Sequence, residues 1–242
     1  MDFLFLVLLF IVALLYASVG HGGASGYLAL MALFGFEQYT MKSSALTLNL
    51  FVSGISFYSF YKKGHFKFKI LLPFITGSVP MSFLGAGLNF NEKTYKIILG
   101  IFLLAAVSRM FFSSKREFEK SETPAFYIPV LIGGVIGFFS GMIGIGGGII
   151  LSPVLLLLHW ADIKETAGIS ALFIFLNSLA GLTGLLLNEN YEPNSNILLW
   201  AAVGLAGGLA GGFLSSNKLS GNKLKYLLAS VLFVASIKLL FI

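Results

Sequence analysis

The stretch "SGMIGIGGGIILSP", residues 140–153, interrupts an otherwise apolar segment with five glycines. Glycine inside a helix costs about 1 kcal/mol relative to alanine, so a continuous helix is not expected there. A second stretch of the same kind, "SVGHGGASGYLAL" at residues 18–30, lies about half a chain earlier. Each stretch separates two apolar segments that are short for a membrane crossing. The sequence therefore predicts two glycine-broken pairs of short helices.

The composition is typical of an integral membrane protein. Of the 242 residues, 57% are hydrophobic and 11% are charged, whereas soluble domains carry about 25% charged residues. The net charge of +6 is typical of basic cytoplasmic loops, and nucleic-acid binding is not expected. The lack of cysteine excludes disulfides, thiolate metal sites and cysteine nucleophiles, and no metal site or cofactor is predicted. Met1 and Asp2 bring no positive charge, so residues 3–17 are expected to stay in the mature protein.

Apolar segments alternate with short polar loops along the chain. Helices are expected for all of them, because a closed barrel would show alternating segments of about ten residues. The two glycine-broken pairs predict hairpins at residues 3–36 and 125–160. The other segments are long enough to cross the bilayer singly. They span residues 40–61, 70–88, 95–112, 166–188, 196–215 and 224–242.

The two halves of the chain repeat each other. "VGHGGASG" of the first half aligns with "IGIGGGII" of the second, and "SSALTLNLFVSG" (43–54) aligns with "ISALFIFLNSLAG" (169–181). The last segments match around Lys96 and Lys225, and around Arg109 and Lys238. These matches keep the same order at an offset of about 124–129 residues. They predict a duplication, with a first repeat at 1–112, a basic linker at 113–124 and a second repeat at 125–242.

Loop charges indicate how the two repeats are oriented. The loop at 62–69 holds four lysines, whereas the equivalent loop at 188–196 holds Glu189 and Glu192 and no Lys or Arg. By the positive-inside rule the first loop is cytoplasmic and the second external, which places 12 of the 16 Lys and Arg residues inside. We therefore predict an all-α polytopic protein of the cell membrane with two inverted repeats, each a glycine-broken helix hairpin plus three transmembrane helices. Inverted repeats with broken helices near the bilayer midplane are an architecture of secondary transporters.

The glycine-rich breaks are suited to binding an anion. A helix N-terminus has unpaired N–H groups and about half a positive charge, and glycine lets the backbone approach a bound group. No acidic residue, and no Lys or Arg, is expected deep in a span, so two half-helix ends near Ala24 and Ile149 would meet the charge of the anion. The alternative is that the glycines only allow close helix packing, which is the expectation for "GLAGGLAGG" at 204–212. Carbonyl-based sodium sites stay open.

Polar side chains near these breaks and in the crossing helices complete the candidate site. His21 is an intramembrane ionisable residue and therefore a functional candidate, although its counterpart is Ile145 and it could simply hydrogen-bond the backbone. Asparagine and serine side chains can donate to an anion or hold helices together. The candidate substrate-binding residues are His21, Gly22, Gly23, Ala24, Ser25, Ser44, Asn49, Gly146, Gly147, Gly148, Ser170 and Asn177.

Together, "GIGGGIILSP" (144–153) and "SALFIFLNSLAG" (170–181) resemble the sulfite exporter TauE/SafE family, also called the four-toluene-sulfonate uptake permeases. The resemblance covers nearly the whole chain. It implies a permease for sulfite, thiosulfate, organosulfonates or related sulfur-containing anions. It leaves open the direction of transport, a coupling ion (proton or sodium), and the choice between monomer and homodimer. The first repeat departs from the pattern, because His21 and Ser25 intrude and Ala29 stands where the second repeat has Pro153.

Two other functions are compatible with the sequence. A channel for small anions could share the architecture, and sequence hardly separates it from a carrier. "GASG" at 23–26 matches the GxSG motif of intramembrane serine proteases, with Ser25 as the nucleophile. Such a serine needs a base within about 3 Å, and the second break has no serine in that place. We therefore expect a transporter and not an enzyme.

Overall fold

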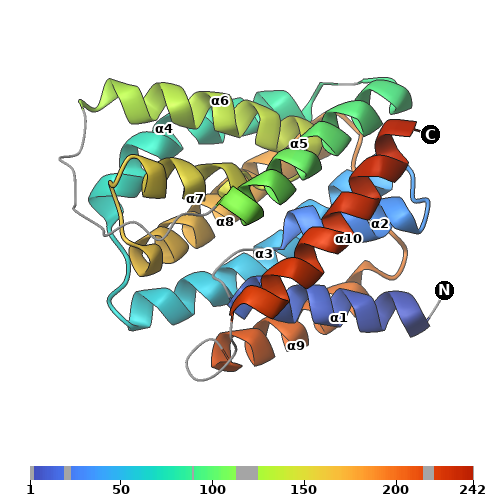
Figure 1. The fold of residues 1–242 in the computed structure, drawn as a ribbon. Coiled ribbons are helices and arrows are strands. Elements are labelled where there is room, and N and C mark those ends of the chain that lie inside the picture. Colours follow the sequence, from blue (N-terminus) through green and yellow to red (C-terminus); the bar gives the residue numbers. More distant parts are fainter. Residues whose placement is uncertain (1–2, 19–22, 89, 113–124, 215–220, 242) are drawn as a thin grey trace.

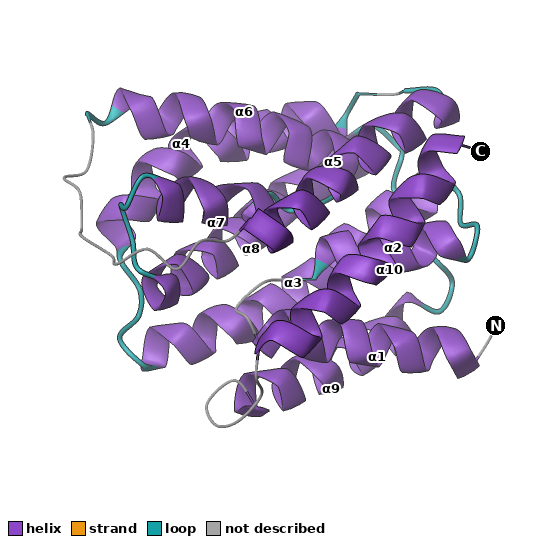
Figure 2. Ribbon diagram, in the orientation of Figure 1, coloured by secondary structure: helices purple, strands orange, loops and turns teal. Residues whose placement is uncertain are grey.

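The computed structural model describes residues 3–18, 23–88, 90–112, 125–214 and 221–241, and the regular elements in these ranges are all α-helices (Figures 1 and 2). In chain order they are α1 (Phe3–Ser18), α2 (Ala24–Leu33), α3 (Gln38–Lys62), α4 (Phe68–Ala86), α5 (Glu92–Phe112), α6 (Tyr127–Ile143), α7 (Gly148–Leu157), α8 (Ile163–Leu187), α9 (Ile197–Leu214) and α10 (Gly221–Phe241). The helices lie side by side in one bundle, with their connections gathered towards its two ends (Figure 1). The prediction of an all-α protein is confirmed.

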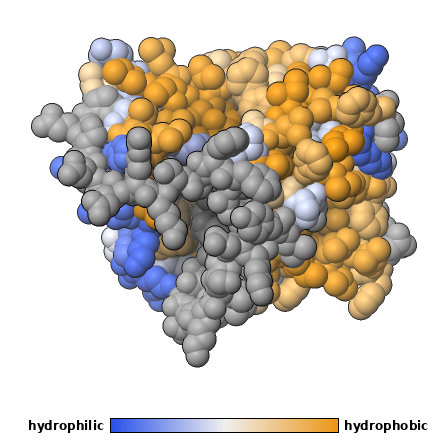
Figure 3. Space-filling view, viewed as in Figure 1, coloured by the Kyte–Doolittle hydropathy of each residue, from blue (hydrophilic) through white to orange (hydrophobic). Residues whose placement is uncertain are grey.

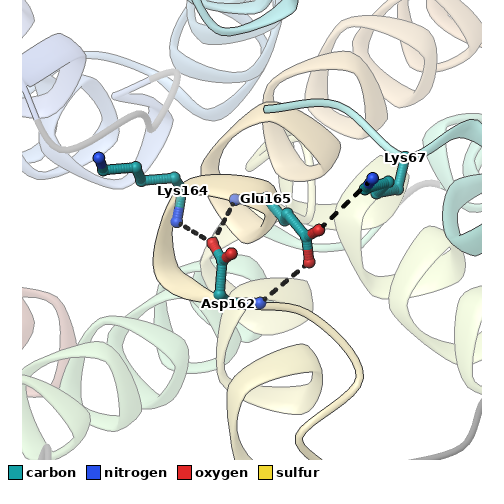
Figure 4. Close-up of polar contacts among 4 residues, drawn as sticks. All are labelled: Lys67, Asp162, Lys164 and Glu165. Atoms are coloured by element: carbon teal, nitrogen blue, oxygen red, sulfur yellow. Dashed lines mark hydrogen bonds and ion pairs between the residues drawn. The ribbon is translucent and has the colours of Figure 1, made fainter. Parts of the chain in front are cut away.

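The helices agree with the predicted segments to within a few residues, and one shift has a clear cause. Helix α8 begins at Ile163 instead of residue 166 because Asp162 caps it. The carboxylate of Asp162 accepts hydrogen bonds from the N–H groups of Lys164 and Glu165 at 2.7 and 2.8 Å (Figure 4). Glu165 in turn accepts from the N–H of Asp162 at 3.3 Å, which completes a capping box. Nζ of Lys67 lies 3.9 Å from Glu165 and links the starts of α4 and α8.

Helices α3 and α8 run antiparallel. Near the start of α3, Oγ of Ser44 accepts a hydrogen bond from the N–H of Asn194, in the loop after α8. Near the start of α8, Gly168 lies directly against the carbonyl oxygen of His65, in the loop after α3. The loops at 62–67 and 188–196 therefore lie at opposite ends of the bundle. Because α3 and α8 hold the same place in the two predicted repeats, this course supports inversion, and the inverted relation of the complete halves stays a prediction.

Glycines allow α6 to pack on α4, and α9 on α1, with almost no space between the backbones. In both pairs a glycine recurs every four residues and faces a carbonyl oxygen of the neighbouring helix. Residue numbers rise together along each pair, so the paired helices run parallel. The contacts are Gly133 with Phe74, Gly137 with Ser78, Gly141 with Ser82, Gly207 with Phe10, and Gly211 with Leu14. Gly207 and Gly211 thus serve packing, as expected for residues 204–212.

The surface of the bundle suits a bilayer. Figure 3 shows a face that is largely hydrophobic along the helices, with hydrophilic residues gathered towards the two ends. Large apolar side chains face outward, among them Leu131, which is 67% exposed, and Leu198, which is 81% exposed. Among the described helices, α4 and α8 are long and apolar enough, by length and composition alone, to cross a membrane. Helix α3 has the same 25-residue length as α8, but it carries buried serines and Asn49, which face other helices.

Candidate substrate site

The second tip, which we define as residues 144–148, joins the end of α6 to the start of α7. Gly144, Gly146 and Gly147 have φ angles of +88°, +75° and +77°. Residues with a side chain rarely adopt such angles, because their Cβ atom clashes with the backbone. The conformation of the chain therefore requires glycine at these three positions, whatever else the tip does.

The N-terminus of α7 is buried and begins on glycines. The N-cap residue is Gly147, which has no side chain with which to cap the helix, and Gly146, Gly147 and Gly148 are all buried. The N-terminal end of a helix carries a partial positive charge and N–H groups that point out of the helix. Such an end inside the protein is complementary to an anion.

The second tip lies against the middle of α3 and α8. A Cβ at Gly146 would lie 2.7 Å from Nδ2 of Asn49 and 3.1 Å from Oγ of Ser178. Nδ2 of Asn49 donates a hydrogen bond to Oγ of Ser178 at 3.2 Å. Because an amide nitrogen carries two N–H bonds, Asn49 keeps one donor beside the tip. A Cβ at Gly147 would lie 3.3 Å from Cβ of Ser140, which adds a hydroxyl from α6.

Asn177 lies in the same region but presents no free donor. Its Nδ2 donates to Oγ of Ser78 at 3.0 Å and to the carbonyl oxygen of Phe173 at 2.8 Å, so both of its N–H bonds are used. Oδ1 of Asn177, Oδ1 of Asn49 and Oγ of Ser140 are buried and have no hydrogen-bond partner in the described part of the chain. Buried polar atoms without partners are uncommon in folded proteins, and two of these three, on Asn49 and Ser140, belong to residues beside the second tip.

The two predicted serines hold other elements in place. Oγ of Ser44 accepts a hydrogen bond from the N–H of Asn194 at 3.1 Å, which fixes the loop after α8. The hydroxyl groups of Ser170 and Ser152 lie 2.9 Å apart, which links α8 to α7. Both serines are fully buried. The structure therefore brings Asn49 to the second tip, and it places Ser44 and Ser170 on either side of Asn49, towards the two ends of the bundle.

The first tip, residues 18–26, is described except for residues 19–22. His21 and Gly22 lie outside the described residues. Gly23 has a φ angle of +87° and precedes α2, whose buried N-terminus at Ala24 has no side-chain cap. The ring of Tyr27 lies over Gly23, where a Cβ would be 2.7 Å from the phenol oxygen. This buried hydroxyl has no described partner and can donate a hydrogen bond at the N-terminus of α2.

Ser25, the serine of the GxSG match, is bound by a tyrosine. Its Oγ lies 2.7 Å from the hydroxyl oxygen of Tyr16, and the serine is 2% exposed. A serine nucleophile needs an adjacent general base, and a phenol hydroxyl in this contact does not supply one. The contact instead joins α1 to α2 inside the hairpin.

Lys42, near the start of α3, is a buried lysine that was not among the predicted site residues. It is 1% exposed, and Nζ donates a hydrogen bond to the carbonyl oxygen of Ala86 at 2.8 Å. Its stem lies against the second tip, since a Cβ at Gly144 would be 2.9 Å from Cγ of Lys42. No described carboxylate pairs with this lysine. The sequence did contain a signal, because Lys42 is the only charged residue in segment 40–61, and a charge within a span is a functional candidate.

A match to a known protein family identifies the family of this chain. A model of the family "Sulfite exporter TauE/SafE" matches residues 4–239. The chain belongs to this family. The resemblance inferred from the glycine-rich break and the helix after it is thereby confirmed, and it extends over both predicted repeats.

Relatives of this TauE/SafE protein are named as transporters. The probable membrane transporter protein y4hK of Sinorhizobium fredii is 37% identical, over 96% of this chain and 95% of the relative. The probable membrane transporter protein MJ0441 of Methanocaldococcus jannaschii is 30% identical, over 99% of this chain and 98% of the relative. No solved structure matches the chain. The protein is therefore a multi-pass membrane protein of a transporter family.

Proposed function

We propose that the protein carries a small sulfur-containing anion, such as sulfite, thiosulfate or an organosulfonate, across the cell membrane. The anion binds near mid-membrane between the N-termini of α7 and α2. One observation carries this proposal: α7 begins inside the protein on three buried glycines, and Gly146 lies against Nδ2 of Asn49. The sulfur chemistry comes from the family, and the anionic charge follows from the helix ends.

Several positively polarised groups of the protein stabilise the negative charge of the anion. A helix N-terminus contributes up to about 2 kcal/mol where it is partly buried. Asn49 adds an N–H, and the hydroxyl of Tyr27 serves the N-terminus of α2. Lys42, whose stem lies against Gly144, adds a positive charge at the end of α4. Together these groups support an affinity in the micromolar-to-millimolar range, or about −8 to −4 kcal/mol.

Alternating access is favoured over an open channel. Gly146, Gly147 and Gly148 are buried, and the side chains around them come from α3, α6 and α8. A site closed in this way must open to each side in turn, as in carriers built on broken helices. We therefore expect saturable and trans-stimulated flux, whereas flux far above carrier rates would identify a channel.

Binding and flux measurements on purified protein test the proposal. A ligand of the native state raises apparent stability, so sulfite, thiosulfate, sulfoacetate or taurine should raise the unfolding temperature. Protein in liposomes should then take up the same labelled anion. If chloride stabilises the protein and none of the sulfur-containing anions does, the substrate class is wrong.

A further inference from the structure

Lysines on the predicted external side are few, and two of them line one cavity. Only Lys42, Lys93, Lys96 and Lys238 fall on that side of the predicted topology, where basic residues are disfavoured. Lys96 and Lys238 line a single cavity of about 170 Å³. Lys42 follows Met41, which lines the same cavity. Two of the four exceptions to the charge rule therefore line one cavity, and a third, Lys42, is the chain neighbour of a lining residue.

The cavity has room for a small anion and an excess of positive charge. Its lining comes from the end of α2, Met41, α5 and α10. Nζ of Lys238 donates to the carbonyl oxygen of Leu33 at 2.9 Å, and no carboxylate in the described part of the chain pairs with this lysine. Lys96 pairs with Glu92, 2.8 Å away and 58% exposed. Since water occupies about 30 Å³ in the liquid, the cavity fits a small oxyanion with some of its water.

The cavity and the second tip lie on either side of the first turns of α3 and α5. Met41 lines the cavity, and the next residue, Lys42, contacts Gly144 of the tip. Lys96 lines the cavity, and the preceding residue, Tyr95, donates a hydrogen bond to the carbonyl oxygen of Ile143 at 2.9 Å. Adjacent residues on two helices thus contact the cavity and the tip.

We propose that this cavity is the external vestibule of the anion pathway, where Lys96 and Lys238 hold a small oxyanion before it passes Lys42 to the second tip. The proposal rests on the proposed function, and it adds where the anion enters and which residues attract it. Positively charged clefts with apolar walls raise the local concentration of an anionic substrate and its rate of association, by on the order of tenfold or more.

The repeat provides an equivalent pair for the other face. Lys96 and Lys238 align with Lys225 and Arg109 at an offset of 129 residues. Those two residues belong to the opposite ends of α10 and α5, and α5 and α10 pack together, with Gly100 against Leu240. A carrier with alternating access needs an entrance on each side. The sequence therefore predicts a second basic pair at the cytoplasmic end of the same two helices.

Thiol labelling tests the vestibule without any need for transport. Gly35 is exposed, lines the cavity and has open space around it, so Gly35→Cys places a single accessible thiol in this cysteine-free chain. Because Gly35 has a φ of +76°, the substitution adds backbone strain, and thermal unfolding checks that the variant is folded. The reaction rate with an anionic methanethiosulfonate is compared with that of a cationic one. Ser195→Cys, in the exposed acidic loop at the same end, is the matched control.

We expect the anionic-to-cationic rate ratio to be on the order of tenfold higher for Gly35→Cys than for Ser195→Cys at low salt. The excess should disappear in the Lys96→Gln, Lys238→Gln background and in high salt. Sulfoacetate, which does not react with thiols, should slow labelling of Gly35→Cys alone. Equal ratios at the two positions, or a ratio that both lysine substitutions leave unchanged, would overturn the proposal.

Two further experiments distinguish a lipid headgroup from a free sulfur-containing anion as the ligand of the cavity. In nanodiscs, phosphatidylglycerol should leave the labelling rate of Gly35→Cys unchanged; if it protects and sulfoacetate does not, the cavity holds a lipid headgroup and the proposal fails. Charge selectivity without protection by any sulfur-containing anion would keep the vestibule and reject the proposed substrate. In liposomes, Lys96→Gln should raise the half-saturating external concentration several-fold and leave the maximal rate almost unchanged.

Discussion

The two asparagines of the matching helices differ at the residue level in what they can still donate. Asn177 uses both of its N–H bonds on Ser78 and Phe173, whereas Asn49 uses one on Ser178 and keeps the other beside Gly146. From the sequence, both residues are predicted to bind the substrate. In the structure, Asn49 keeps the free donor. Asn177 instead helps to hold α4 against α8.

Asn49→Ala should therefore weaken anion binding by about 1–3 kcal/mol, the usual cost of losing a buried hydrogen-bonding group. Asn177→Ala should lower stability by a similar amount, because it removes two hydrogen bonds, while affinity changes less. Calorimetric titration and thermal unfolding of both variants measure the two effects. Equal losses of affinity would mean that Asn177 rearranges to donate to the anion.

Lys42 has two roles that one substitution can separate. Its Nζ caps the end of α4 at Ala86 and its stem contacts Gly144. Lys42→Met keeps the length of the side chain and removes the charge, so affinity should fall by about 1.5–3 kcal/mol, as for hydrogen bonds to charged groups. Isothermal titration decides the matter, with Lys93→Met at the exposed start of α5 as control. A variant that melts lower and binds normally would make Lys42 a helix cap only.

The half-length helices α2 and α7 are the elements that set this protein apart from a simple bundle. Each has 10 residues, which is below the length at which an isolated helix is stable in water. Packing against full-length helices stabilises them, and their N-termini stay inside the protein. The conformation of each tip depends on glycines with positive φ.

Gly147→Val should abolish transport and leave a folded protein. The valine would need a φ of +77° and its Cβ would lie 2.8 Å from the ring of Phe173, so the N-terminus of α7 must move. Gly23→Val should act in the same way at the first tip. Gly64→Val is the matched control, since Gly64 has a φ of +73° with open space around it. Liposome flux and gel filtration measure the outcome; normal flux in both tip variants would reduce the tips to packing elements.

The α4–α6 contact predicts that two glycines of α6, one helical turn apart, differ in how well they tolerate a side chain. Gly137 lies directly against the backbone of Ser78, whereas the nearest atom to a Cβ at Gly134 is 3.7 Å away. Gly137→Ala should therefore destabilise the protein by about 1–3 kcal/mol, as overpacking does. Gly134→Ala should be close to neutral. Thermal unfolding in detergent measures both, and equal stability of the two variants would show that the helices separate without cost.

At the scale of the whole molecule, the order and type of the helices could be predicted because apolar length and glycine breaks determine them locally. The partners of individual side chains could not, since they depend on how α3, α4 and α8 meet. Lys42 illustrates the limit, because only the fold shows that it is buried against Ala86 and Gly144. The same holds for Ser44, whose partner Asn194 lies 150 residues away in the chain.

The orientation of the whole bundle is the last prediction. The loops at 62–67 and 188–196 lie at opposite ends, as the contacts of Gly168 and Ser44 require. Lysines concentrate at the first end, in the loop at 62–69, and acidic residues at the second, in the loop at 188–196, so the first should face the cytoplasm.

A thiol introduced by Gly64→Cys should resist an impermeant reagent in intact cells and react after the membrane is opened. A thiol introduced by Glu192→Cys should react in both states, and Asn188→Cys at the end of α8 provides a second external position. Labelling of Gly64→Cys alone in intact cells would reverse the bundle and move the vestibule to the cytoplasmic face. Labelling of both positions from the same side would contradict the antiparallel course of α3 and α8, and with it the inverted repeats on which alternating access depends.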